Sequence, residues 1–237
     1  ILEANPRASR TMPFVSKVTG NQIIKAGTLL MLGHSLDSIK KTTNYLNSST
    51  NKVAIKKAIF PWSRFPAEDT MLGPEMKATG EVLGIGRSFG VALNKAYAAA
   101  GVEINENEKG IFVSLSDQEK PNFIKIVKTY SDLGFKIYST YGTGEYLKNN
   151  DINSTIVGRA DETFPTSLTI LQDKLISLVI NTPTFANEYT DGWKIRRLSH
   201  ETGVAVVSSV REAEAFLKAF LETTKSFEDM EAIQNVS

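Results

Sequence analysis

Residues 135–144 read Phe-Lys-Ile-Tyr-Ser-Thr-Tyr-Gly-Thr-Gly. The apolar part, Phe135 to Ser139, is predicted to be a strand that leads through a glycine-containing turn into a short helix. Such a turn exposes backbone N–H groups, the positive end of the helix and the hydroxyls of Thr140 and Thr143, which together suit a phosphate. Turns of this composition more often serve only as turns and caps, so the residues alone leave both interpretations open.

Short apolar strands alternate with helices on both sides of this turn. The further strands are expected at Gly110 to Leu115, Ile156 to Val157, Leu175 to Ile180 and Val204 to Val207, and the helices at Pro121 to Leu133, Trp193 to Thr202 and a last segment with an apolar stripe at Val210, Ala213, Leu217 and Phe220. Alternation of this kind implies crossover connections around a buried parallel sheet. The predicted fold class is therefore α/β.

Ligands bind such sheets outside the carboxyl ends of the strands. Besides Thr140 and Thr143, those ends carry Lys120 and Asn181. Lys120 offers a compact positive charge and Asn181 an amide, so that hydroxyls, an amide and a lysine are expected to converge. This edge of the sheet is the candidate phosphate site.

The first part of the chain has a less regular pattern. An apolar helical face at Ile23, Ile24, Leu29 and Leu30 is expected to end at Gly33, followed by a surface connection at residues 36–51, a strand at Val53 to Phe60 and a helix from Ser88 through Ala100 that Gly101 closes. The acidic, asparagine-rich segment Val102 to Lys109 suggests a boundary between two domains, 1–102 and 103–237.

Residues 2–14, Leu-Glu-Ala-Asn-Pro-Arg-Ala-Ser-Arg-Thr-Met-Pro-Phe, bring together groups that bind metals and phosphates. In a strand, Glu3 and Asn5 would project from one face, and oxygen ligands at this spacing suit Mg²⁺ or Mn²⁺ that holds nucleotide phosphates. Arg7 and Arg10 can each offer a planar fork of donors to phosphate or carboxylate. An ordinary edge strand followed by a solvated loop would explain the same residues.

The composition argues against several functional classes. The 237 residues are 41% hydrophobic, enough for a substantial core, and 27 basic against 26 acidic residues give no sign of a nucleic-acid or anionic-membrane surface. Without cysteine the chain has no disulfides or thiolate sites, and it has only two histidines. No stretch approaches the roughly 20 apolar residues that span a bilayer, so a cytoplasmic protein is expected.

Residues 2–14 closely resemble the last metal-binding strand of the second ATP-grasp unit in carbamoyl phosphate synthetase large subunits. Further similarity lies in Pro13 to Gly20, Leu72 to Gly86 and Ser139 to Gly144, and the resemblance covers essentially the whole chain. It implies a C-terminal fragment of such a subunit. Residues 1–102 would be the end of the second ATP-grasp domain, and residues 103–237 a methylglyoxal synthase-like allosteric domain with a Rossmann-like parallel sheet.

The resemblance also implies an activity for the parent protein. That protein would be an ATP-dependent carbon–nitrogen ligase that makes carbamoyl phosphate from glutamine or ammonia, bicarbonate and two ATP, for arginine and pyrimidine biosynthesis. Glu3 and Asn5 would hold Mg²⁺ or Mn²⁺ with ATP, and Arg7 and Arg10 would stabilise the phosphate or carbamate charge. The fragment alone is expected to be inactive, and its partners would be the rest of the large subunit and a glutaminase small subunit.

In the same family the second domain binds an effector, UMP or IMP. Lys120, Thr140, Thr143 and Asn181 match the phosphate and ribose contacts, and Arg159 stands where a lysine is common. Ornithine activation is not expected, because Lys57 replaces a glutamate found in ornithine-activated members and Val206 replaces a polar aromatic residue.

Three other expectations remain open for this domain. It is also expected to self-associate, and it could be an assembly module that has lost its ligand. A stand-alone methylglyoxal synthase-like lyase is the third alternative, although the sequence lacks the carboxylate base and the histidine–aspartate segment that the resemblance would require.

Overall fold

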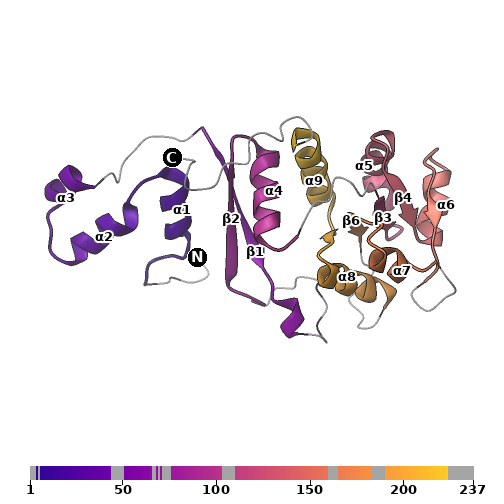
Figure 1. Cartoon of the computed structure of the whole chain (residues 1–237), viewed down its shortest axis with the longest axis horizontal. Coiled ribbons are helices and arrows are strands. Elements are labelled where there is room, and N and C mark those ends of the chain that lie inside the picture. The colour runs from indigo at the N-terminus through magenta and orange to yellow at the C-terminus, as the bar shows by residue number, and fades with distance from the viewer. Residues whose placement is uncertain are drawn as a thin grey trace.

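The computed structural model describes residues 4, 6–43, 51–65, 68, 70, 76–102, 110–159, 165–182 and 190–223. Figure 1 shows three groups of elements along the long axis: the helices α1 to α3, then a two-stranded ribbon with helix α4, then a sheet surrounded by helices. Helix α9, close to the end of the chain, lies between α4 and this sheet. Helix α9 therefore joins the second and third groups.

The first group consists of α1 (Thr11–Thr19), α2 (Ile23–Met31) and α3 (Leu36–Thr42). The helix predicted to end at Gly33 is confirmed, and Gly33 has the positive φ of 89° that favours glycine. The surface connection expected at residues 36–51 is wrong for its first half, which is α3. The Ser35 hydroxyl caps this helix by accepting from the Ser38 N–H at 3.3 Å, and Ile39 is buried.

The second group is an antiparallel ribbon of β1 (Val53–Ile59) and β2 (Gly80–Gly86) covered by α4 (Phe89–Ala99), with a short 3₁₀ turn, η1 (Trp62–Arg64), after β1. The helix expected from Ser88 is confirmed, and the Ser88 hydroxyl caps it. The sequence did not predict β2. It packs so closely under α4 that a Cβ added to Gly84 would lie 2.0 Å from the carbonyl oxygen of Ala92.

The third group is a five-stranded parallel sheet in the order β5-β4-β3-β6-β7. Its strands are β3 (Gly110–Ser114), β4 (Lys136–Ser139), β5 (Thr155–Ile156), β6 (Leu178–Asn181) and β7 (Ala205–Val207). The predicted α/β fold with a parallel sheet is confirmed, and its arrangement is Rossmann-like. Because β3 lies at the centre, its carboxyl end is flanked by those of β4 and β6.

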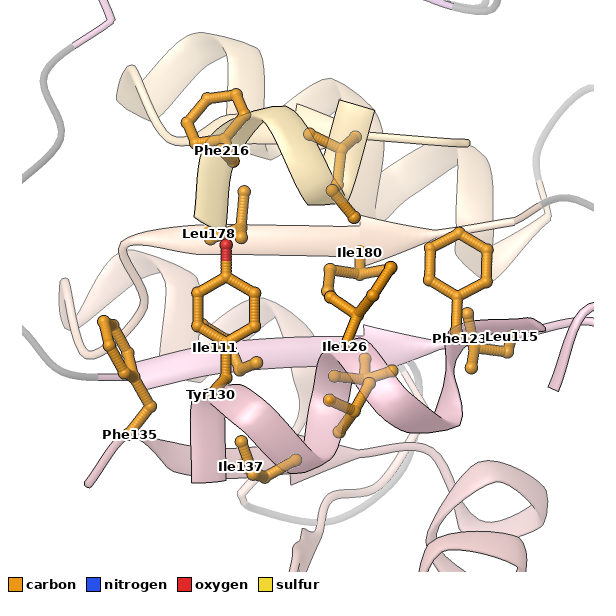
Figure 2. Packing of buried hydrophobic residues seen from close by; sticks show 14 of the residues in the cluster. Ile111, Leu115, Phe123, Ile126, Tyr130, Phe135, Ile137, Leu178, Ile180 and Phe216 are labelled. Atoms are coloured by element: carbon orange, nitrogen blue, oxygen red, sulfur yellow. The ribbon is translucent and has the colours of Figure 1, made fainter. Parts of the chain in front are cut away.

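Helices cover both faces of this sheet: α5 (Lys120–Asp132), α6 (Tyr141–Lys148), α7 (Ser167–Gln172), α8 (Asp191–Thr202) and α9 (Val210–Thr223). One core, shown in part in Figure 2, joins Ile111 and Ile180 to α5 and α9, for example through Phe123 and Phe216. The other core joins Phe112 and its neighbours to α7 and α8. Alternate residues of β3 thus face opposite layers, as a strand requires.

The ribbon and the sheet region contact each other through α4 and α9. The rings of Tyr97 and Phe216 meet edge to face with centroids 4.5 Å apart, and the Gly90 N–H donates to Glu222 Oε2 at 2.6 Å. Residues 103–109 lie outside the described residues, so the division of the chain at 102/103 stays a prediction.

Among the helices of the described residues, none combines the length and the apolar character needed to cross a lipid bilayer.

Candidate functional site

The Thr140 turn has the predicted geometry. β4 ends at Ser139 and α6 begins at Tyr141, with Thr140 as the N-cap. Thr143 is only 1% exposed, and its Oγ1 accepts hydrogen bonds from the Leu115 N–H at 3.0 Å and from the Thr140 hydroxyl at 3.2 Å. Because the Thr143 oxygen is the acceptor in both hydrogen bonds, its own hydroxyl proton can be donated to a ligand. The turn therefore presents a fixed hydroxyl donor beside the first N–H groups of a helix.

Lys120 lies at the start of α5 and reaches this same turn. The residue is 9% exposed, and a Cβ added to Gly142 would lie 3.7 Å from its Nζ. Its ammonium group donates to Asp117 Oδ1 at 2.5 Å, and the Asp117 side chain is 93% exposed. The sequence analysis did not single out Asp117. A bound anion would share the ammonium group with this carboxylate.

Asn181 ends β6 and is held from two sides. Its Nδ2 donates to the Ser114 carbonyl at 3.4 Å, and its Oδ1 accepts from Arg196 Nη1 at 2.7 Å. Asn181 and Arg196 are each 3% exposed. Arg196 fixes which end of the amide carries the N–H groups, and it places a buried cation next to the site. Sequence reasoning missed Arg196, because a charged residue next to an apolar one is the ordinary pattern of an amphipathic helix.

Three successive residues at the carboxyl end of β3 hold the end of β6 and the start of α6 in place through hydrogen bonds. Ser114 accepts from Asn181, the Leu115 N–H donates to Thr143, and the Ser116 N–H donates to the Thr182 hydroxyl at 2.8 Å. The structure thus gathers Lys120, Thr140, Thr143 and Asn181 around the carboxyl end of β3.

Arg159 lies near the start of α8. It follows β5, its side chain is mostly exposed, and its Nε is 4.0 Å from Asp191 Oδ2 at the start of α8. The first turn of α8 also covers Asn181, since a Cβ added to Gly192 would lie 3.6 Å from Asn181 Oδ1. Arg159 is thus placed on the α8 side of Asn181. Its predicted contact with a ligand stays a prediction.

The site predicted in the first part of the chain is only partly within the described residues. Glu3 and Asn5 lie outside them. Arg7 is exposed and its Nη1 donates to the neighbouring carbonyl of Ala8 at 3.2 Å, whereas Arg10 Nη1 donates to the Thr79 carbonyl at 3.4 Å, next to β2. Within the described part of the chain, histidine and acidic residues form no group of three that could hold a metal ion. The metal site stays a prediction.

Lys57, which replaces the expected glutamate, lies where the ribbon meets the sheet region. Its Nζ is 4.3 Å from the centroid of the Tyr97 ring. Burial lowers the pKa of Lys57, and the nearby Glu212 carboxylate opposes that shift. Because Tyr97 belongs to α4 and Glu212 to α9, this amine is partly enclosed by the chain itself.

Comparison with known proteins supports the predicted resemblance. Residues 122–208 match the family described as the MGS-like domain. The chain is 38% identical to the carbamoyl phosphate synthase large chain of Nostoc sp. over 99% of its own length, which is 21% of that protein. It is 37% and 36% identical to the carbamoyl phosphate synthase large chain, C-terminal section, of Aquifex aeolicus and Methanocaldococcus jannaschii, over 97% and 96% of this chain and 45% and 38% of those proteins.

The chain thus spans between about a fifth and just under half of the length of these relatives. Along almost all of its own length it is similar to the C-terminal section of carbamoyl phosphate synthase large chains, and its residues 122–208 match the MGS-like domain.

Proposed function

We propose that this chain serves as the regulatory end of a carbamoyl phosphate synthase large chain, and that its sheet region binds a nucleoside monophosphate such as UMP or IMP. The observation that carries the proposal is the convergence of Lys120, Thr143 and Asn181 at the carboxyl end of β3. All three residues are buried, with 9% of Lys120, 1% of Thr143 and 3% of Asn181 exposed, so that little side-chain freedom is lost when a ligand binds.

Each group has a distinct task in this proposal. The first turn of α6 supplies backbone N–H donors and a positive helix end to the phosphate, and the Thr143 hydroxyl adds a fixed donor. Lys120 contributes the charge-assisted contact. Asn181, oriented by Arg196, donates to a ribose or phosphate oxygen. Thr140 and Arg159 are the remaining proposed ligand contacts, and Arg159 approaches the ligand from the α8 side of Asn181.

The decisive test compares wild type with Lys120→Ala in titrations with UMP and with IMP. Removing the charge-assisted contact should weaken binding about ten- to a hundredfold, that is, by roughly 1.5 to 3 kcal/mol. Calorimetry measures the affinity, and ligand excess should raise the melting temperature of wild type. Lys125→Ala, an exposed lysine on the same helix, is the matched control and should bind like wild type.

Two further arms separate the alternatives. Ornithine should give no heat, because Lys57 supplies the wrong charge for a cationic ligand. If neither nucleotide binds to wild type, the domain is better explained as an assembly module, whose oligomeric state sedimentation would report. Release of methylglyoxal from dihydroxyacetone phosphate would instead favour the lyase.

For the parent protein we infer the ligase reaction that yields carbamoyl phosphate, with Glu3 and Asn5 on Mg²⁺ or Mn²⁺ and with Arg7 and Arg10 near the transferred phosphate. The chain itself should show no bicarbonate-dependent ATP hydrolysis, because in this family the glycine-rich loop and further metal carboxylates precede the aligned segment. Adding the preceding part of a large chain, together with its glutaminase partner, should restore hydrolysis. Turnover by the 237-residue chain alone would contradict this proposal.

A further inference from the structure

Helix α8 carries two adjacent arginines that form hydrogen bonds in different directions. Arg196 Nη1 donates to Asn181 Oδ1 at 2.7 Å, within the candidate site. Arg197 Nη1 donates to the Phe65 carbonyl at 2.8 Å, just after the 3₁₀ turn that follows β1. Consecutive helical residues point about 100° apart, so one helix can hold both contacts. α8 therefore binds to the candidate site with one residue and to the ribbon region with the next.

A second contact strengthens the attachment of α8 to the ribbon region. His200 lies three residues after Arg197, on the same side of the helix, and its ring centroid is 6.1 Å from that of Trp62. Burial, and then the charges of Lys57, Arg197 and Arg196, lower the pKa of His200 to about 4. The imidazole is therefore neutral at pH 7 and packs as an uncharged ring.

The geometry of α8 allows movement at one end to reach the other. Its first turn covers Asn181, because a Cβ added to Gly192 would lie 3.6 Å from Asn181 Oδ1 and 3.0 Å from Arg196 Nη1. Arg197 lies about 8 Å farther along the helix axis and His200 about 12 Å. A helix moves as a unit, and a displacement of about 1 Å is enough to break a hydrogen bond of ordinary length.

The far end of this connection is the wall of a cavity. Phe65 lines a cavity of about 470 Å³ between the end of β1 and the start of β2. Thr79 lines the same cavity, and its carbonyl accepts from Arg10, one of the two arginines predicted for the catalytic site. A change in how Arg197 holds Phe65 would therefore change one wall of the cavity that Thr79, the acceptor of the Arg10 hydrogen bond, also lines.

We propose that α8 couples the effector site to this cavity: an anion bound beside Asn181 shifts α8 and so changes the hold of Arg197 on the Phe65 carbonyl. The proposal rests on the proposed nucleotide binding. Linkage makes the coupling reciprocal, so the loss of the Arg197 contact must change nucleotide affinity although Arg197 does not contact Asn181. Arg197 is thus a positioning residue and does not contact the ligand.

The test uses the two tryptophans of the chain, Trp62 and Trp193. In the Trp193→Phe protein, emission reports only Trp62, which is buried beside Phe60 and His200. Titration with UMP or IMP should change this emission. Adding Arg197→Gln should reduce the change by about half or more, and should alter the calorimetric Kd about threefold or more, near the lower end of typical allosteric coupling.

Two variants keep this test informative. Arg211→Gln, an exposed arginine on α9, should match the Trp193→Phe protein in both readouts. Glu201→Gln loosens Arg197 by removing its ion pair at 2.8 Å and should shift both readouts in the same direction by less, even if Arg197→Gln fails to fold. The coupling would be overturned, while nucleotide binding stands, if Arg197→Gln changed neither the Kd nor the Trp62 response. If Arg197→Gln does not fold, the same result in Glu201→Gln would overturn it. Absence of nucleotide binding in wild type would overturn both.

Discussion

The two parts of the chain hold their predicted functional side chains in different ways. In the sheet region, Thr143 and Asn181 are buried and are bonded to the backbone at the end of β3. In the first part, Arg7 and Arg10 are exposed, and their guanidinium groups donate to the backbone carbonyls of Ala8 and Thr79.

This difference bears on what each part can do without a further partner. Immobilising a long side chain costs about 0.5 to 1.5 kcal/mol on binding, and the buried residues of the sheet region have already lost that freedom on folding. The two exposed arginines still have to lose it. We therefore expect the sheet region to bind its ligand as it stands, and the first part to need additional contacts to order its arginines.

The largest effect on stability is expected from Gly84→Ala, which disturbs the packing of β2 against α4 in the first part of the chain. The new Cβ would lie 2.0 Å from the Ala92 carbonyl oxygen and 2.6 Å from the Ala96 nitrogen, both backbone atoms of α4. Separating helix and strand should cost about 3 kcal/mol or more of unfolding free energy. Urea unfolding followed by tryptophan emission measures this loss.

Gly80→Ala, in the same strand as Gly84, is the matched control, because the atom nearest to its new Cβ, the Ile59 carbonyl oxygen of β1, would be 3.6 Å away. Nucleotide affinity should persist in Gly84→Ala wherever the protein is folded. If both glycine variants lose the same stability, the close approach of α4 is not what stabilises the ribbon.

The same glycines show where sequence reasoning falls short. Strands β3, β4 and β6 were predictable because short apolar runs between helices indicate a buried parallel sheet. β2 was not, since a strand with Gly80, Gly84 and Gly86 has weak strand propensity, and its glycines are explained by the approach of α4. α3 was missed because its polar sequence resembles a loop, although Ser35 caps it and Ile39 anchors it.

The candidate site was predictable to a similar extent. The residues at the carboxyl ends of strands could be identified from the pattern, and the structure gathers four of them. Arg196 could not be identified, because its importance comes from Asn181, a partner that only folding brings close. Asp117 was missed although it lies just three residues before Lys120, because an exposed aspartate in a turn is common. The metal-binding role of Glu3 and Asn5 stays a prediction.

A smaller effect on the free energy of unfolding is expected from lowering the pH, through His200 at the contact between α8 and Trp62. The unfolded chain takes up a proton on His200 near its ordinary pKa of about 6.5, whereas burial and the neighbouring cations hold the native pKa at about 4. The stability from the neutral imidazole is therefore complete above pH 6.5 and is lost as the pH falls toward 4. Allowing for partial solvent access, the loss should be about 2 kcal/mol.

Urea unfolding at a series of pH values between 7 and 4 measures this dependence. His200→Gln should flatten the curve in that window, whereas His34→Gln, which changes the exposed histidine, should leave it as in wild type. A wild-type curve that both variants reproduce would mean that carboxylates alone determine the acid sensitivity.

The smallest effect tests whether the preformed site recognises charge through Lys120. Asp117 holds the ammonium group at 2.5 Å, but its side chain is 93% exposed, so the pair contributes little stability and mainly places a negative charge beside the incoming phosphate. Asp117→Asn should strengthen UMP or IMP binding by about three- to fivefold, or less than about 1 kcal/mol, and high salt should reduce the gain. Calorimetry at two salt concentrations measures this, with Asp132→Asn, an exposed aspartate at the end of α5, as the control. Weaker binding in Asp117→Asn would mean that this carboxylate positions Lys120 for the ligand, so that Asp117 itself belongs to the preformed site.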